Sequence, residues 1–150
     1  MESMTSGNRP GKISILVVDD QPEIRKLTVL MLSRAGYTVS SAENGHEAVS
    51  LIKRRPVDIM VLDMVLGESF DGLDCYREAV SIRPGLKAII VSGYPQSSRI
   101  AEAQALGAGK FIQKPYHAKE LLNALREEIE KERSAGDASG RVQGGSRGSA

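Results

Sequence analysis

The chain has 150 residues, 41% of them hydrophobic, which leaves room for one domain with a buried core. Its 20 basic and 19 acidic residues balance to a net charge of +1, so charge gives no reason to expect binding to nucleic acid or to an anionic membrane. No apolar run approaches the ~20 residues that span a bilayer. The single cysteine, Cys75, excludes an intrachain disulfide, and together these features predict a cytoplasmic protein.

Strand and helix patterns alternate five times along the chain. Strands are predicted over residues 13–18, 38–42, 57–62, 86–91 and 110–113. Each is followed by a helical pattern, at residues 22–35, 48–52, 73–80, 97–106 and 121–129. The charged run 127–133 predicts a solvated face on the last helix. The Ser-, Gly- and Pro-containing segment 1–11 and the Gly/Ser-rich segment 134–150 are predicted to be disordered, which leaves one folded unit over residues 12–133.

This alternation predicts an α/β fold in which helices cover both faces of a parallel sheet. The first strand is continuously apolar and β-branched, as expected for a strand that is buried on both faces. Pro22 suits the first turn of the helix that follows, and Gly36 is expected to end that helix.

Polar side chains stand where four of the predicted strands end. They are Asp19, Asp20, Asp63, Ser92 and Lys114. Because the carboxyl ends of parallel strands meet at one edge of a sheet, we expect these side chains to lie together. Three converging carboxylates repel one another unless a cation joins them, and ligands that are all oxygen select a hard ion such as Mg²⁺.

The same residues suit phosphoryl transfer, which needs a nucleophile, a metal ion and donors for the phosphoryl oxygens. Asp63 supplies a carboxylate nucleophile, Lys114 a positive charge and Ser92 a hydroxyl group. Each residue alone is a weak signal, since an Asp after a strand is more often a turn residue or a helix cap. The prediction depends on all of them falling at successive strand ends.

Residues 12–133 resemble the response regulator receiver family. The match includes the acidic pair after the first strand, Asp63 after the third, Ser92 after the fourth and Lys114 with Pro115 after the fifth. Flanking segments agree as well, at residues 44–48 (Asn-Gly-His-Glu-Ala), 71–73 (Asp-Gly-Leu) and 106–108 (Leu-Gly-Ala). The resemblance implies a doubly wound, flavodoxin-like sheet of five strands in the order 2-1-3-4-5.

By this resemblance, the chain is a phosphoacceptor of two-component signal transduction or of a phosphorelay. Asp63 would take a phosphoryl group from a phosphohistidine on a sensor histidine kinase or a histidine phosphotransfer protein. The resemblance also implies Mg²⁺ as cofactor, held by Asp19, Asp20, Asp63 and the backbone carbonyl of Val65.

Four further residues take roles from the resemblance. Ser92 and Lys114 would contact the phosphoryl oxygens, and the peptide bond between Lys114 and Pro115 would be cis. Phe111 would be the aromatic switch residue, with a plain core aromatic as the alternative. Phosphorylation would change a protein-binding surface made by the helix at 97–106, the strand at 110–113 and the last helix. The protein would then be a switch, not a turnover enzyme, with neither nucleic acid nor membrane as partner.

One segment departs from the family pattern. Residues 63–72 lack the usual proline and are one residue longer, which bears on the metal side of the site. Two alternative functions stay open: a hydrolase of the aspartyl-phosphate type, which normally carries its nucleophile in a D-x-D pattern after the first strand, and a degenerate receiver that only binds partners. A stand-alone protein and a piece of a hybrid histidine kinase are both compatible with the sequence.

Overall fold

The computed structural model describes residues 12–67 and 69–132 of the chain. The strands are β1 (Ser14–Val18), β2 (Thr38–Ala42), β3 (Ile59–Asp63), β4 (Lys87–Ser92) and β5 (Phe111–Gln113). The helices are α1 (Pro22–Arg34), α2 (Gly45–Arg54), α3 (Gly72–Ile82), α4 (Ser98–Ala105) and a C-terminal helix over residues 118–132. The segments predicted to be disordered, 1–11 and 134–150, lie outside the described residues and stay predictions.

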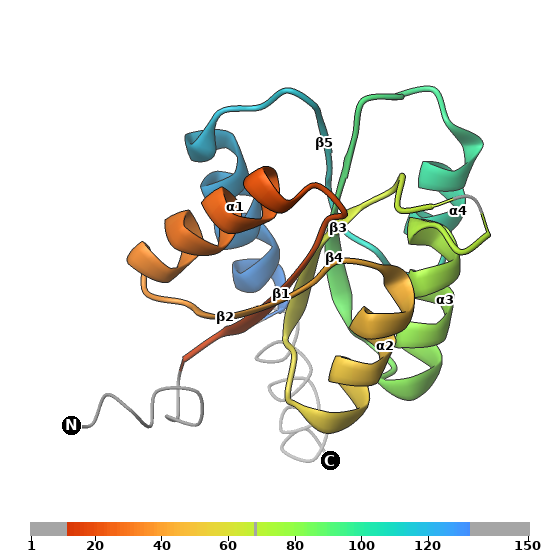
Figure 1. Cartoon of the computed structure of the whole chain (residues 1–150), viewed down its shortest axis with the longest axis horizontal. Helices are drawn as coiled ribbons and strands as arrows, with labels where there is room; N and C mark the ends of the chain where they lie inside the picture. The colour runs from red at the N-terminus through yellow and green to blue at the C-terminus, as the bar shows by residue number, and fades with distance from the viewer. Residues whose placement is uncertain (1–11, 68, 133–150) are drawn as a thin grey trace, which may run out of the picture.

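The five strands form one parallel sheet in the order β2-β1-β3-β4-β5, which confirms the predicted fold class and strand order. Figure 1 shows the sheet between two helical layers, with α1 and the C-terminal helix on one face and α2, α3 and α4 on the other. Because every strand runs the same way, all five carboxyl ends lie at one edge of the sheet.

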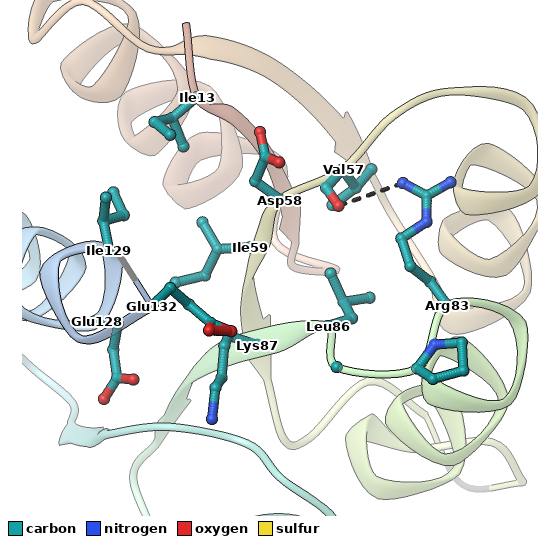
Figure 2. A pocket seen from close by; sticks show the side chains of 12 residues that line it. Ile13, Val57, Asp58, Ile59, Arg83, Leu86, Lys87, Glu128, Ile129 and Glu132 are labelled. Carbon is teal, nitrogen blue, oxygen red and sulfur yellow. Dashed lines mark hydrogen bonds between the residues drawn. The ribbon is translucent and has the colours of Figure 1, made fainter. Parts of the chain in front are cut away.

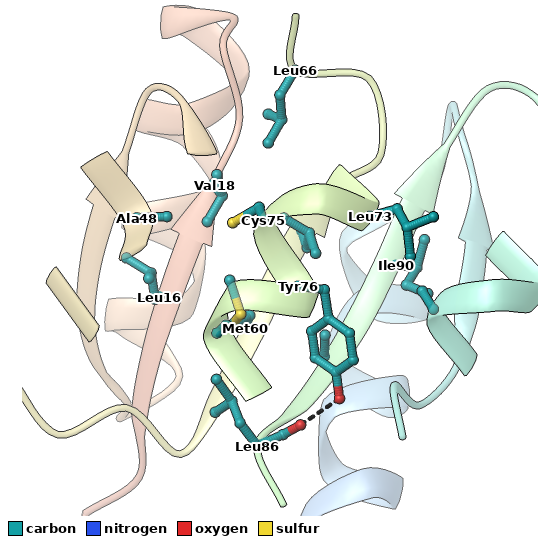
Figure 3. Close-up of a cluster of buried hydrophobic side chains, with 14 of the residues drawn as sticks. Leu16, Val18, Ala48, Met60, Leu66, Leu73, Cys75, Tyr76, Leu86 and Ile90 are labelled. Carbon is teal, nitrogen blue, oxygen red and sulfur yellow. Dashed lines mark hydrogen bonds between the residues drawn. The ribbon is translucent and has the colours of Figure 1, made fainter. Parts of the chain in front are cut away.

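Each face of the sheet carries its own hydrophobic core, because successive residues of a strand point to opposite faces. In β1, Leu16 packs with the core under α2, α3 and α4, whereas Ile15 packs with the core under α1 and the C-terminal helix. Figure 3 shows the first of these cores, where the buried Tyr76 hydroxyl donates a hydrogen bond to the carbonyl of Leu86. The continuously apolar strands are therefore a consequence of burial on both faces.

The helix ends follow the expected local chemistry. Pro22 occupies the first turn of α1, and Gly36 follows that helix with a φ of 104°, a conformation that L side chains rarely adopt. The side chain of Asn44 caps α2 by accepting a hydrogen bond from the backbone N–H of Glu47 at 2.8 Å. Within the described parts of the chain, no helix is both long and apolar enough to cross a membrane.

The prediction of a solvated face on the last helix is wrong at one position. Glu128 is only 2% exposed, and its Oε2 accepts a hydrogen bond from the backbone N–H of Lys110 at 3.1 Å. The charged run could not reveal this, because the bond joins residues 18 positions apart that only the packing of the helix brings together.

Candidate functional site

The carboxyl edge of the sheet brings together the polar residues that end its strands. Asp19 directly follows β1, and Asp63 and Ser92 are the last residues of β3 and β4. Lys114 directly follows β5, and its backbone N–H donates a hydrogen bond to the carbonyl of Ser92 at 2.9 Å. The peptide bond between Lys114 and Pro115 is cis. Parallel pairing of the strands thus places these side chains at one edge, as the sequence predicts.

Three carboxylates form the centre of this site. Asp19, Asp20 and Asp63 each offer one oxygen atom, and these atoms lie within 4.8 Å of one another. Asp19 and Asp63 are buried, whereas Asp20 is exposed. The Asp19 carboxylate is held by the backbone N–H of Gln21 at 2.9 Å. Oxygen atoms at this spacing, open to solvent on one side, fit a hard divalent cation that keeps some of its water ligands.

Lys114 is the cation that the chain itself brings to these carboxylates. Its Nζ lies 3.0 Å from Oδ2 of Asp63 and 3.6 Å from Oδ2 of Asp19. The other oxygen of Asp63 accepts a hydrogen bond from the backbone N–H of Val65 at 3.1 Å. Since the cluster holds three carboxylates and Lys114 brings one ammonium group to it, the cluster retains negative charge that a divalent ion would offset.

Burial sets the electrostatics of the two central groups. Burial raises the pKa of Asp63 above its usual range, although Lys114 and the Val65 N–H both favour the ionised carboxylate. Burial acts to lower the pKa of Lys114, but attraction to Asp63 and the hydrogen bond between them outweigh it, and the pKa of Lys114 is raised. The ammonium group therefore stays charged and favours the ionised form of Asp63, whereas burial makes that ionised form costly in free energy.

The remaining predicted residues lie around this centre. Ser92 is 1% exposed, and its Oγ accepts a hydrogen bond from the backbone N–H of Tyr94 at 3.1 Å. Val65 is exposed at the start of the loop after β3. Phe111, the first residue of β5, is half-buried and packs against the core under α4. Its position fits either of its predicted roles, a switch residue or a plain core aromatic.

An apolar groove beside the site had no counterpart in the sequence predictions. It has a volume of about 520 Å³, lies between α1 and residues 114–118, and includes Lys114 in its wall. Its apolar lining includes Ile24, Leu27, Met31, Pro115 and Tyr116. The exposed position of Leu27, at 67%, was hidden in the sequence because its helical spacing with Ile24 and Met31 equally predicts a buried face.

A second hollow, of about 350 Å³, lies at the opposite, amino edge of the sheet (Figure 2). Two of its charged residues, Asp58 and Arg83, bond to the backbone. Asp58 accepts a hydrogen bond from the N–H of Ser14 at 2.8 Å, and Arg83 donates to the carbonyls of Ile52 at 3.0 Å and Val57 at 3.3 Å. We therefore regard this edge as structural.

A family model for the response regulator receiver domain matches residues 15–126. Together with the parallel sheet of order β2-β1-β3-β4-β5 and its acidic edge, this match shows that the chain belongs to the response regulator receiver family. Its members are phosphoacceptor switches of two-component signal transduction, and they bind Mg²⁺ at an acidic pocket.

Two relatives and one solved structure illustrate the similarity. The chain is 35% identical to the chemotaxis protein CheY of Thermotoga maritima, over 74% of this chain and 92% of CheY. It is 31% identical to the transcriptional regulatory protein GlrR of Escherichia coli K12, over 82% of this chain but only 28% of GlrR. A receiver domain structure from Methanospirillum hungatei JF-1 superposes with a TM-score of 0.78 at 27% identity, and the match covers 83% of this chain and 99% of that one.

Proposed function

We propose that Asp63 is the residue that receives the phosphoryl group. The observation that carries this proposal is the contact of Lys114 Nζ with Asp63 at 3.0 Å, inside a cluster whose other carboxylates lie within 4.8 Å. A carboxylate oxygen of Asp63 would attack the phosphorus atom of a phosphohistidine. The new P–O bond would form as the P–N bond breaks. The electron pair of the P–N bond would stay on the imidazole nitrogen of the donor.

The neighbouring residues would lower the barrier to this transfer. Asp19, Asp20, Asp63 and the backbone carbonyl of Val65 would hold Mg²⁺, which supplies positive charge to the phosphoryl oxygens when it is bound. Lys114 would move its ammonium contact from the carboxylate to a phosphoryl oxygen, and the Ser92 hydroxyl would donate to another. Both side chains are largely shielded from water, which strengthens such contacts.

Phosphorylation would act as a switch between two populations of the domain and not as a step of a turnover enzyme. A hydrogen bond from Ser92 to the phosphoryl group would shift the segment that joins β4 to α4, and Phe111 would turn inward beside that segment. The surface formed by α4, β5 and the C-terminal helix would change as a result and bind a downstream protein. The half-buried position of Phe111 at the edge of the core is compatible with this role.

The phosphodonor would be a sensor histidine kinase or a histidine phosphotransfer protein in the cytoplasm. Such a donor needs a surface next to Asp63 on which to dock. The apolar groove along α1 meets this need, because Lys114 forms part of its wall and contacts Asp63 directly. No feature of the described residues or of the relatives favours an aspartyl-phosphate hydrolase or a phosphorylation-independent module.

A small phosphodonor, such as acetyl phosphate, tests this proposal with Mg²⁺ present. Mass spectrometry of the intact chain should show a gain of one phosphate, which Asp63→Asn abolishes. Asp58→Asn removes the same charge at the amino edge and should be phosphorylated like the unaltered chain. Phosphate uptake by Asp63→Asn at an unchanged rate would show that another residue is the acceptor.

A further inference from the structure

The loop that follows Asp63 is held at its two ends by hydrogen bonds from backbone N–H groups. At its start, the N–H of Val65 donates to Oδ1 of Asp63 at 3.1 Å. At its end, the N–H of Gly72 donates to the carbonyl of Met64 at 2.9 Å. A Cβ atom at Gly72 would come within 2.7 Å of the Asp63 carbonyl oxygen and of the Met64 Cα. The first turn of α3 therefore lies directly against the backbone of the phosphoacceptor.

Asp71 fixes this first turn. It is the N-cap of α3, where its Oδ1 accepts a hydrogen bond from the N–H of Asp74 at 3.1 Å. The side chain of Asp74 accepts a hydrogen bond from the N–H of Asp71 in return, also at 3.1 Å, which completes a capping box. A displacement of Asp71 would thus shift the start of α3 and, through Gly72, the residues that follow Asp63.

Arg99, in the first turn of α4, forms a bidentate ion pair with Asp71. Its Nε donates to one carboxylate oxygen of Asp71 and its Nη2 donates to the other at 2.9 Å, with a further contact to Asp74 at 3.4 Å. The pair closes one wall of a hollow of about 190 Å³ that Val65 and Ser92 also line. Burial acts to raise the pKa of Asp71, but the bonds from Arg99 and the Asp74 N–H lower it.

We propose that Arg99 is a positioning residue for the metal side of the site: through its two-pronged pair with Asp71, it sets the geometry of Met64 and Val65 and ties the start of α3 to α4. The reason this chain needs such a tether is the loop itself, which has no proline to restrict it between Asp63 and Asp71. The inference rests on the proposed function, in which Asp63 and the Val65 carbonyl hold Mg²⁺.

The sign of the expected effect separates positioning from simple charge. Arg99 is a cation in the hollow that Val65 and Ser92 also line, so by electrostatics alone its removal would tighten the binding of Mg²⁺. If Arg99 acts by placing the loop, its removal weakens Mg²⁺ binding instead. Arg77 gives a matched control in the same α3–α4 contact, since it pairs with Asp74 at 3.8 Å and Glu102 at 3.0 Å but has no bond to Asp71 among the described contacts.

Calorimetric titration with Mg²⁺ alone tests the proposal on the full chain. Arg99→Ala should raise the Kd for Mg²⁺ by about fivefold, the scale expected for a partly exposed ion pair. Arg99→Lys should recover part of that loss, since an ammonium group keeps the charge but cannot make the two-pronged bond. Arg77→Ala should stay within about twofold of the unaltered chain. The amide resonance of Val65 should shift in the metal-free Arg99→Ala variant and stay in place in Arg77→Ala.

A double substitution tests whether Asp71 transmits the effect. Asp71→Asn keeps a good N-cap but loses the ion pair, so adding Arg99→Ala to it should change the Kd by less than about twofold. If the unaltered chain binds Mg²⁺ and is phosphorylated, and Arg99→Ala binds Mg²⁺ equally or more tightly, this inference alone is overturned. An unaltered chain that binds no Mg²⁺ overturns both this inference and the proposed metal site.

Discussion

The two edges of the sheet both carry charged side chains, but among the described residues only the carboxyl edge gathers three carboxylates beside one ammonium group. At the amino edge, Asp58, Arg83 and Glu128 bond to backbone N–H and carbonyl groups. At the carboxyl edge, the carboxylate of Asp63 meets the side chain of Lys114 and neighbouring carboxylates. A charge that is matched to the backbone satisfies a polar group that folding would otherwise leave without a partner. Buried like charges that face one another cost free energy and are kept where they serve chemistry.

This difference in charge arrangement distinguishes the functional edge of the sheet from the structural edge better than the volumes of the hollows do. The amino-edge hollow, at about 350 Å³, lies in size between the two hollows of the carboxyl edge, at about 190 Å³ beside Ser92 and about 520 Å³ along α1. It nevertheless lies away from the carboxyl ends of the strands, where parallel α/β sheets bind their ligands. If the comparison is right, substitutions at the carboxyl edge change phosphorylation, and substitutions at the amino edge change only stability.

Among substitutions that keep Asp63, the largest expected effect comes from removing a proposed metal ligand. Asp20→Asn should slow phosphorylation by a small phosphodonor by at least about 100-fold. The substitution weakens the binding of the cation that would offset charge on the phosphoryl oxygens. Asp58→Asn makes the same chemical change at the amino edge and should leave the rate within about twofold. Rates of phosphate incorporation at fixed Mg²⁺ concentration measure both. Equal loss in the two variants would show that net charge, and not position, controls the reaction.

The sequence predicted this edge well for a physical reason. A strand buried on both faces cannot continue through a charged residue, so Asp19 and Asp63 mark strand ends in the sequence itself. Parallel pairing then brings them together whatever the detailed packing is. The strand bounds were close too: β3 is Ile59–Asp63 against a predicted 57–62, and β5 is Phe111–Gln113 against a predicted 110–113.

Contacts between helices and loops were beyond the sequence. The pair of Arg99 with Asp71 joins residues 28 positions apart, and the rings of His46 and Phe70 stack at 4.1 Å between α2 and the loop after β3. Both depend on how α2, α3 and α4 are rotated against the sheet, which periodicity does not specify. Buried Glu128 was missed for the same reason, because helical charge runs are solvated in most proteins.

A middle-sized effect is expected at the amino edge. Glu128→Ala should lower the free energy of unfolding by about 2 kcal/mol, since it leaves the backbone N–H of Lys110 without its acceptor and opens a cavity. Glu128→Gln keeps an acceptor of the same size and should cost less than half as much. Urea unfolding followed by circular dichroism measures these values. Phosphorylation at Asp63 should be unchanged in the folded variants, and a slowed reaction would link the two edges.

The smallest expected effect is on the free energy of unfolding, and it has an unusual sign: a substitution at Asp63 itself should stabilise the fold. Without Mg²⁺, Asp63→Asn should raise the free energy of unfolding at neutral pH by about 1 kcal/mol, because the buried carboxylate is ionised at a cost. Since burial raises the pKa of Asp63 in the folded state, this cost is absent well below the usual carboxyl range and grows as pH rises through the raised pKa.

The difference in free energy of unfolding between Asp63→Asn and the unaltered chain should therefore shrink on acidification. Saturating Mg²⁺ should also shrink this difference at neutral pH, because it stabilises only the chain that keeps all the proposed ligands. Thermal unfolding over a pH series, with and without Mg²⁺, measures this difference. A variant less stable than the unaltered chain at neutral pH would mean that the Lys114 contact outweighs burial, and that this edge is held together like the other one.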